Sequence, residues 1–414
     1  MTLAPLLADL LGEDLPVGIR TFDGESVGPP DPPATLVVRS PDALRRILFA
    51  PGEIGFARAY VAGDIDVEGD IHVLLRSLRD RLPNVHLTAR QWVRLAEEVG
   101  ARQLRPLPPP AEEIRLRGRR HSKARDASAV TAHYNVSNEF YRLLLGPALT
   151  YSCAVFESPD TSLEDAQAAK HDLICRKLDL QAGMRVLDIG CGWGSFAIHA
   201  ATHYGVSVVG VSLSEPQVEL GRKRVAERGL TDLVDLRVQD YRELDDGPFD
   251  AIASVGMAEH VGPGLRDYTR AVHGLLPPGA RYLHHSIAKA GPEVDKRWRP
   301  ALPTFIDRYV FPDSHLHRIG ATVAALEGEG LEVRHVESLR EHYALTLRRW
   351  TANLEASWDE AVSQIGLPRA RIWHLYLAGC ALVFDVGNVQ VHQVLTVRPE
   401  DGDAHLPLRL SFED

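Results

Sequence analysis

The chain has 414 residues, 45% of them hydrophobic and 25% charged, which is the composition of a folded protein large enough for more than one domain. Its formal net charge of −10 argues against a general nucleic-acid-binding protein, because such proteins need a basic surface. The sequence shows no signal peptide, no apolar stretch of bilayer-spanning length and no disulfide-type cysteine spacing, so we expect a reduced, cytoplasmic protein.

The N-terminal part, residues 1–104, predicts a small α/β accessory domain. Residues 34–40 (ATLVVRS) have the β-branched character of a strand. Residues 40–49 predict a helix with Ser40 as its cap and Pro41 at its first position. We find no catalytic constellation in this region.

Residues 105–127 predict a stiff, proline-rich linker that ends in a basic cluster. The cluster is the densest group of positive charge in the chain and contains Arg115, Arg117, Arg119, Arg120, Lys123 and Arg125. One interpretation is a solvated connection. The other is a surface that binds anionic lipid headgroups, to which each basic side chain contributes about 1 kcal/mol of binding free energy.

Residues 128–414 form the third predicted region, in which strands and helices alternate. The expected strands cover residues 185–190, 206–214, 234–240, 249–257 and 279–288, with a helix over 215–229 and one or two closing strands within 383–399. Such alternation predicts a parallel, doubly wound, Rossmann-like sheet with helices on both faces.

The first strand of this region ends in a glycine-rich turn, DIGCGWG, over residues 188–194. Glycines permit a tight turn and a close approach of backbone to ligand, at the edge of the sheet where such folds bind their ligands. The spacing is not the GxGxxG of a pyrophosphate cradle. It is similar to the first motif of class I methyltransferases, which bind S-adenosylmethionine (SAM). Many of these have an acid after the second strand, where this chain has Ser212.

Seven motifs in order then resemble one family, the cyclopropane-fatty-acyl-phospholipid synthases, which include the mycolic acid cyclopropane synthases. The motifs are HYNVSNEFY, YSCAVF, DIGCGWGS, VSLSEPQ, GMAEHVG, HHSIA and HYALTLRRW, within residues 128–395. The N-terminal segment 48–70 also resembles actinobacterial members that make 10-methylene fatty acids, the precursors of tuberculostearic acid.

The resemblance implies two sets of site residues. A bound bicarbonate would lie among Cys153, Glu259, His285 and Tyr343, where Cys153 and Tyr343 donate hydrogen bonds and the other two orient the ion and handle its proton. The SAM site would comprise Tyr151, Ser152, Asp188, Gly190, Gly192, Ser212, Leu213, Gln217, Asp240 and Tyr241. No metal is implied. Cys191, within the glycine turn, is expected to be a small buried hydrophobic residue.

The implied reaction is SAM-dependent methyl transfer to the cis double bond of an acyl chain in a phospholipid. It passes through a carbocation, and a hydride shift followed by bicarbonate-assisted loss of a proton from the new methyl group gives a 10-methylene product. A cyclopropane synthase is the first alternative, and a small-molecule or sterol methyltransferase is the second. Ala258 stands where many relatives have an aromatic residue, so a wider pocket is expected and the product stays open.

The expected partners follow from this substrate. They are the acyl chains of phospholipids at the inner face of the membrane, which the enzyme would meet as a peripheral cytoplasmic protein. No nucleic-acid partner is expected. The resemblance also allows a homodimer and a downstream reductase that consumes the product.

Overall fold

The computed structural model describes residues 3–12, 15–79, 93, 105–114, 137–291, 304–312 and 314–412. The chain divides into two compact units. The first comprises Met1–Arg115, Val294–Pro312 and Leu354–Leu382, and the second comprises Leu116–Glu293, Asp313–Asn353 and Val383–Asp414. The two later segments of the first unit were not expected there. The predicted boundaries at 104 and 128 stay a prediction, and the basic cluster from Arg115 to Arg125 lies outside the described residues.

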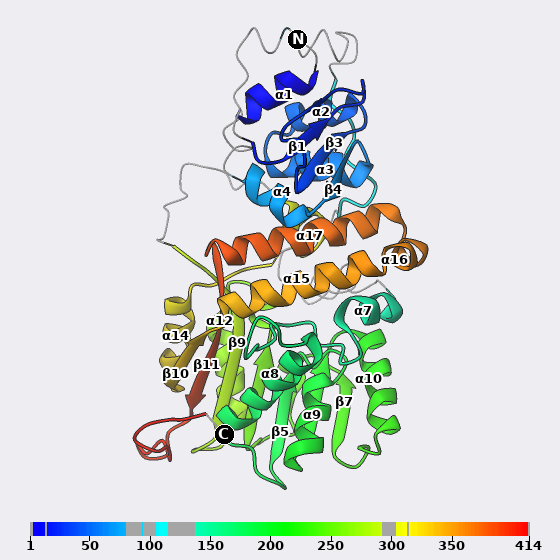
Figure 1. Cartoon of the computed structure of the whole chain (residues 1–414). Coiled ribbons are helices and arrows are strands. Elements are labelled where there is room, and N and C mark those ends of the chain that lie inside the picture. Colours follow the sequence, from blue (N-terminus) through cyan, green and yellow to red (C-terminus); the bar gives the residue numbers. More distant parts are fainter. Residues whose placement is uncertain are drawn as a thin grey trace. The chain divides into compact units, whose positions relative to one another are not determined.

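The first unit contains the predicted small α/β fold (Figure 1). Its sheet has the order β2-β1-β3-β4, formed by β1 (Gly18–Arg20), β2 (Ser26–Val27), β3 (Ala34–Val38) and β4 (Ile65–Gly69). Its helices are α1 (Leu3–Leu11), α2 (Asp42–Phe49), α3 (Glu53–Ala62), α4 (Ile71–Leu78), α13 (Phe305–Tyr309), α16 (Trp358–Ile365) and most of α17 (Leu367–Asp385). The predicted start of α2 was wrong by one residue: Pro41 is the cap itself, while the Ser40 hydroxyl accepts the Asp42 N–H at 3.1 Å.

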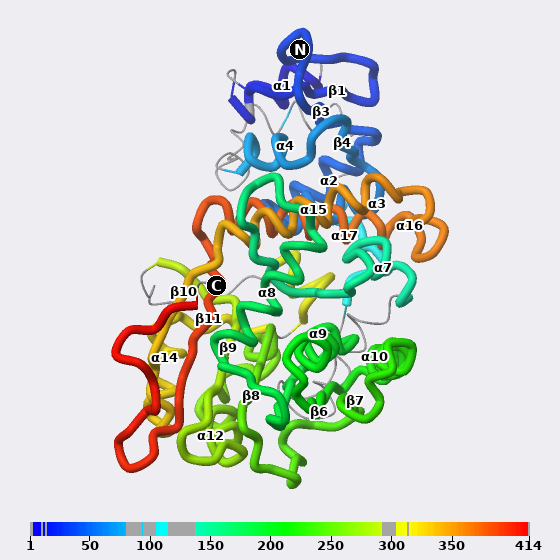
Figure 2. Tube along the Cα trace, turned by 60° about the horizontal axis from the view of Figure 1, so that its bottom comes forward, coloured from blue at the N-terminus to red at the C-terminus, as the bar shows by residue number. Residues whose placement is uncertain are grey.

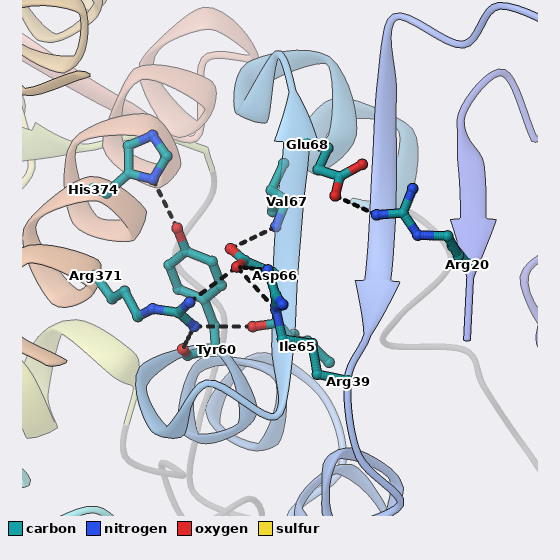
Figure 3. A network of polar contacts seen from close by, with 9 residues as sticks. All are labelled: Arg20, Arg39, Tyr60, Ile65, Asp66, Val67, Glu68, Arg371 and His374. Atoms are coloured by element: carbon teal, nitrogen blue, oxygen red, sulfur yellow. Dashed lines mark hydrogen bonds and ion pairs between the residues drawn. The ribbon is translucent and has the colours of Figure 1, made fainter. Parts of the chain in front are cut away.

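A polar network explains why the late segment that contains α17 belongs to the first unit (Figure 3). The guanidinium of Arg371 donates to the backbone oxygens of Tyr60 (2.9 Å) and Ile65 (3.1 Å) and to the carboxylate of Asp66 (3.0 Å). One turn further along α17, His374 Nδ1 lies 2.7 Å from the Tyr60 hydroxyl. The end of α3 and the start of β4 thus present acceptors that a cation on α17 satisfies.

The second unit contains a seven-stranded sheet of order β10-β11-β9-β8-β5-β6-β7 (Figure 1). The strands are β5 (Arg185–Ile189), β6 (Ser207–Ser212), β7 (Val234–Val238), β8 (Ala251–Val255), β9 (Arg281–Lys289), β10 (Glu332–Ser338) and β11 (Val389–Val397). The helices are α7 (Asn138–Leu145), α8 (Leu163–Leu178), α9 (Ser195–Tyr204), α10 (Glu215–Glu227), the 3-10 helix η3 (Tyr241–Glu243), α11 (Ala258–Val261), α12 (Leu265–Leu275), α14 (Ile319–Gly328) and α15 (Arg340–Ala356).

The predicted doubly wound sheet is confirmed. All five predicted strands form and run parallel, and the closing segment adds β11, which is antiparallel to β9. The first residues of that closing segment instead end α17. Strand β10, which pairs with β11 at the sheet edge, was not predicted.

Side-chain alternation divides the core of this unit into two layers. On one face α8, α9 and α10 lie side by side (Figure 2) and pack with Val186, Val208 and Leu283. On the other face α12 and α14 pack with Leu187 and Val209. Because successive residues of a strand point to opposite faces, Asp188 in β5 and His285 in β9 both face the helix layer that contains α8.

Candidate active site

The glycine turn after β5 has the backbone that a ligand cradle needs. Gly190 and Gly192 have φ of 85° and 54°, in the region that favours glycine. A Cβ at Gly192 would meet no atom of the described residues within 4 Å, so this turn leaves open space beside its backbone. Cys191 is 7% exposed and packs in the apolar core, as predicted.

Asp188 stands directly before this turn with an incompletely paired carboxylate. It is 3% exposed, and its Oδ2 has no hydrogen-bond partner among the described residues. Desolvation raises the pKa of Asp188 to about 7, against the opposing effect of the Lys170 charge. A buried carboxylate oxygen of this kind is suited to an amine or hydroxyl of a bound ligand.

Three further predicted SAM residues lie where β6 and β7 end. The backbone oxygen of Ser212 accepts the Gln239 N–H at 3.1 Å, which joins the two strand ends. Both carboxylate oxygens of Asp240 accept hydrogen bonds from the Arg242 guanidinium at 2.8 and 2.5 Å, a pairing that the sequence did not reveal. The Tyr241 and Tyr268 rings pack in a T-shaped arrangement with 5.0 Å between their centroids. The half-buried Tyr241 ring thus lies at this edge of the sheet.

The other predicted SAM residues occupy the same side of the second unit. Gln217 is buried one turn into α10, and Leu213 is half-buried in the turn before it. The Tyr151 ring lies 5.4 Å from the Trp350 ring of α15. Its neighbour Ser152 accepts a hydrogen bond from Lys170 at 3.1 Å.

Glu259 lies in α11, just after the end of β8, and His285 lies within β9. Glu259 Oε1 accepts the Ile287 N–H at 2.6 Å, while Oε2 has no partner among the described residues. The Gly256 N–H donates to the His285 backbone oxygen at 2.9 Å, which joins the loop of Glu259 to β9. Burial raises the pKa of Glu259 to about 7 and lowers that of His285 well below its ordinary value. The histidine is therefore neutral, and its Nδ1 also lacks a partner within the described chain.

Cys153 and Tyr343 converge on a single carbonyl. The Leu339 oxygen accepts the Cys153 thiol at 3.6 Å and the Tyr343 N–H at 3.0 Å. The Leu339 N–H donates to Val391 at 2.9 Å, and Val391 pairs with Ile287 in the sheet. Burial raises the pKa of the Cys153 thiol, so it stays a neutral donor.

These backbone hydrogen bonds connect the segments that carry the four predicted residues, through the last residues of β9 and the first residues of β11. Together they offer two weak or neutral donors, a neutral imidazole and a carboxyl group that ionises near neutral pH. Such a set can hold a small oxyanion and move one proton.

Lys170 on α8 was missed. It is 1% exposed, and its ammonium contacts Ser152 and, at 3.3 Å, His171 Nδ1. Lysine is normally a surface residue, so the sequence analysis did not single it out. A signal existed in the i, i+4, i+8 spacing of Ala166, Lys170 and Ile174, which places the lysine on the apolar face of the helix.

Ala258, the predicted departure from the family pattern, is 3% exposed and packs in the apolar layer that includes α12. Its effect on the pocket and the product stays a prediction. None of the helices in the described parts of the chain has the length and apolar character of a membrane span.

Comparison with known proteins places this geometry in a family. Residues 121–394 match the family model for mycolic acid cyclopropane synthetase. The chain belongs to the mycolic acid cyclopropane synthetase family. A probable fatty acid methyltransferase of Mycobacterium tuberculosis is 41% identical over 406 residues, 95% of this chain and 94% of that protein. One of Pseudomonas putida is 40% identical over 409 residues, 98% of each chain.

Solved structures agree with the family. The cyclopropane synthase MmaA2 of Mycobacterium tuberculosis superposes with a TM-score of 0.61 at 34% identity, over 66% of this chain and 98% of that one. A mycolic acid cyclopropane synthase complexed with SAH and CTAB gives 0.61 at 35% identity, with the same coverage. The predicted family and fold are confirmed, and the protein is a SAM-dependent methyltransferase.

The residues present fit SAM. The open glycine turn admits a ligand close to the backbone, and the unpartnered oxygen of Asp188 provides an acceptor beside it. The contacts of the individual predicted residues with SAM stay predictions.

Proposed function

We propose that this family member methylates the cis double bond of unsaturated acyl chains in phospholipids and forms a 10-methylene product. The observation that carries the proposal is that Glu259 Oε2 and His285 Nδ1, both in buried side chains, lack a partner among the described residues. Cys153 and Tyr343, also buried, are connected to them through the backbone hydrogen bonds described above. Methyl transfer to an amine needs no such group, whereas a carbocation in an acyl chain needs a base close to it.

The extent of the similarity supports a fatty acyl substrate. The relatives that match nearly the whole chain bear the name fatty acid methyltransferase. A cyclopropane mycolic acid synthase of Mycobacterium leprae is 37% identical but covers only 65% of this chain, with 93% of its own length. The additional N-terminal unit is thus shared with the proteins named for fatty acids.

The chain's own residues would act on two bound groups. SAM supplies the methyl group, held where the turn at Gly190 and Gly192 lets the backbone approach and where Asp188 accepts a hydrogen bond. Bicarbonate, which we propose as the second group, supplies a small base in an apolar site. Its fit rests on the unpartnered Glu259 Oε2 and His285 Nδ1.

Each residue of the ion site then has one task. The Cys153 thiol, on turning away from its backbone acceptors, and the Tyr343 hydroxyl would donate hydrogen bonds to the ion, and neutral His285 would orient it. Glu259, with a pKa of about 7, would accept or return the proton. Burial excludes water, which protects a carbocation from hydration.

The test is an incubation of the purified protein with SAM, bicarbonate and vesicles of oleoyl phospholipid, followed by proton NMR of the released fatty acids. Olefinic protons of an exocyclic methylene are the expected result. High-field ring protons would instead identify a cyclopropane synthase. Unchanged lipid would contradict the proposal and point to a small-molecule or sterol methyltransferase.

We also propose peripheral binding to anionic membranes through the basic cluster Arg115–Arg125. Replacing its arginines with glutamate is expected to weaken binding to vesicles that contain anionic lipid, since each basic side chain contributes about 1 kcal/mol. Unchanged vesicle binding would contradict this role. A product-consuming reductase and a homodimer stay predictions.

A further inference from the structure

Helix α8 carries two buried lysines that differ in how their charge is compensated. Lys170 and Lys177 are 1% and 0% exposed and lie seven residues, or two helical turns, apart. The Lys177 ammonium pairs with the Glu337 carboxylate and donates to Gln393 at 2.7 Å. Among the described residues, the Lys170 ammonium contacts only the Ser152 hydroxyl and His171, and no carboxylate lies within ion-pair distance of it.

The surroundings of Lys170 are those of the candidate active site. Ser152, which it holds, directly precedes Cys153. Asp188 and His285 come from β5 and β9 on the face that packs against α8. The charge of Lys170 acts on all of them: it opposes the rise in the pKa values of Asp188 and Cys153 and adds to the lowering of the pKa of His285.

A buried ammonium with neutral partners is unfavourable unless an anion lies near it. Asp188 supplies part of that negative charge, but its desolvated carboxyl is itself only partly ionised near neutral pH, since its pKa is about 7. A small oxyanion between Cys153 and His285 would complete the charge balance.

We propose that Lys170 is a positioning residue for the oxyanion site, whose buried positive charge, held beside Cys153 through Ser152, draws bicarbonate to the buried side chains of Cys153 and His285. This inference rests on the proposed function for its ion. It adds a residue that neither the sequence motifs nor the comparisons assign.

The experiment compares Lys170→Met, which removes the charge, with Lys170→Arg, which keeps it. The matched control is Lys177→Met, which removes an equally buried charge from the same helix. Three quantities are measured on each full-length protein: binding of carbon-13-labelled bicarbonate by NMR, binding of SAM by calorimetry, and the bicarbonate concentration that gives half the maximal rate.

In Lys170→Met we expect bicarbonate to bind about tenfold more weakly, because the attraction between the lysine charge and the ion is lost. The half-saturating bicarbonate concentration should rise by the same factor. SAM affinity should fall by a smaller factor, because Lys170 reaches the predicted SAM residues Ser152 and Asp188 but is proposed to attract the ion directly. Lys170→Arg should restore most of the ion binding. Lys177→Met should weaken it much less, because Glu337 already pairs with the Lys177 charge, although that charge also reaches His285.

Four results would overturn the inference. The first is that Lys170→Met binds bicarbonate as tightly as the native protein. The second is that it loses SAM binding alone, which would assign the lysine to the SAM carboxylate. Equal losses in Lys170→Met and Lys177→Met would show a general effect of removing buried lysines. A native enzyme that methylates lipid without binding bicarbonate would refute both the ion and this role for Lys170, whereas a protein that binds bicarbonate but leaves lipid unchanged would refute only the proposed substrate.

Discussion

Two polar clusters of this protein differ in how far their atoms are paired. In the first unit, Asp66 accepts from Arg39, Arg371 and the Val67 N–H, and the Tyr60 hydroxyl meets His374. In this network only Arg371 Nε lacks a partner among the described residues. In the second unit, three buried polar atoms of the candidate site lack a partner among the described residues.

Those three buried polar atoms are Asp188 Oδ2, Glu259 Oε2 and His285 Nδ1, again within the described residues. Buried polar atoms are normally hydrogen-bonded, so unpaired ones need a reason. A paired cluster stabilises the fold, and an incompletely paired one keeps capacity for a ligand. The predictions below test that distinction.

The largest effect is expected for Glu259→Gln. The amide keeps the hydrogen bond from Ile287 but cannot exchange the proton, so the rate should fall about 1,000-fold, within the range of acid–base catalysis. SAM binding, measured by calorimetry, should be unchanged. A variant with near-native activity would remove Glu259 from the proton path.

The same variant should also be more stable than the native protein at alkaline pH. Burial raises the pKa of Glu259 from 4.5 to about 7, so the native fold binds a proton that the unfolded chain has released. Native stability therefore falls as pH rises through this window. Urea unfolding at about pH 8 should show a gain of up to about 3 kcal/mol for Glu259→Gln, and at about pH 4 none.

In the paired cluster, Arg371→Met should reduce stability and spare activity. The substitution leaves the backbone oxygens of Tyr60 and Ile65 without their donor, and we expect a loss of about 3 kcal/mol in the free energy of unfolding. Activity per folded molecule should stay native. Lost activity at native stability would instead give this network a functional role.

The pH profile of the native enzyme gives an intermediate effect. With a pKa of about 7 for Glu259, the rate should rise about tenfold between about pH 6 and pH 8 as the carboxylate forms. The residual activity of Glu259→Gln should lack this rise. If both proteins share the rise, another group controls it.

Gly192→Ala should weaken SAM binding by about tenfold, because its methyl group would occupy the open space beside the turn, and strain at positive φ adds about 1 kcal/mol. Gly183→Ala is the matched control, since Gly183 also has positive φ and open surroundings but precedes β5. Calorimetry should show native SAM affinity for the control. Equal losses in both would indicate strain alone.

The smallest effect is expected for Tyr60→Phe, which removes one hydroxyl from the paired cluster. Loss of its hydrogen bond to His374 should lower the free energy of unfolding by about 1 kcal/mol. Thermal unfolding measures this directly. A larger loss would mean that His374 depends on Tyr60 for its own contact with Glu355.

The sequence by itself determined the strands β5 to β9, the turn at Gly190 and Gly192, and the family. These features depend on local patterns: apolar runs, glycine where φ is positive, and motifs of fixed spacing. They can be predicted from one segment at a time, because each depends on residues that are close together in the chain.

Only the tertiary structure decided three other features. Strand β10 has no strong pattern of its own and forms by pairing with β11. The segment Leu354–Leu382 joins the first unit through Arg371, whose acceptors lie some 300 positions earlier. Lys170 resembles an ordinary surface lysine until the sheet covers it. In each case the deciding free energy comes from contacts between distant segments, which local sequence does not specify.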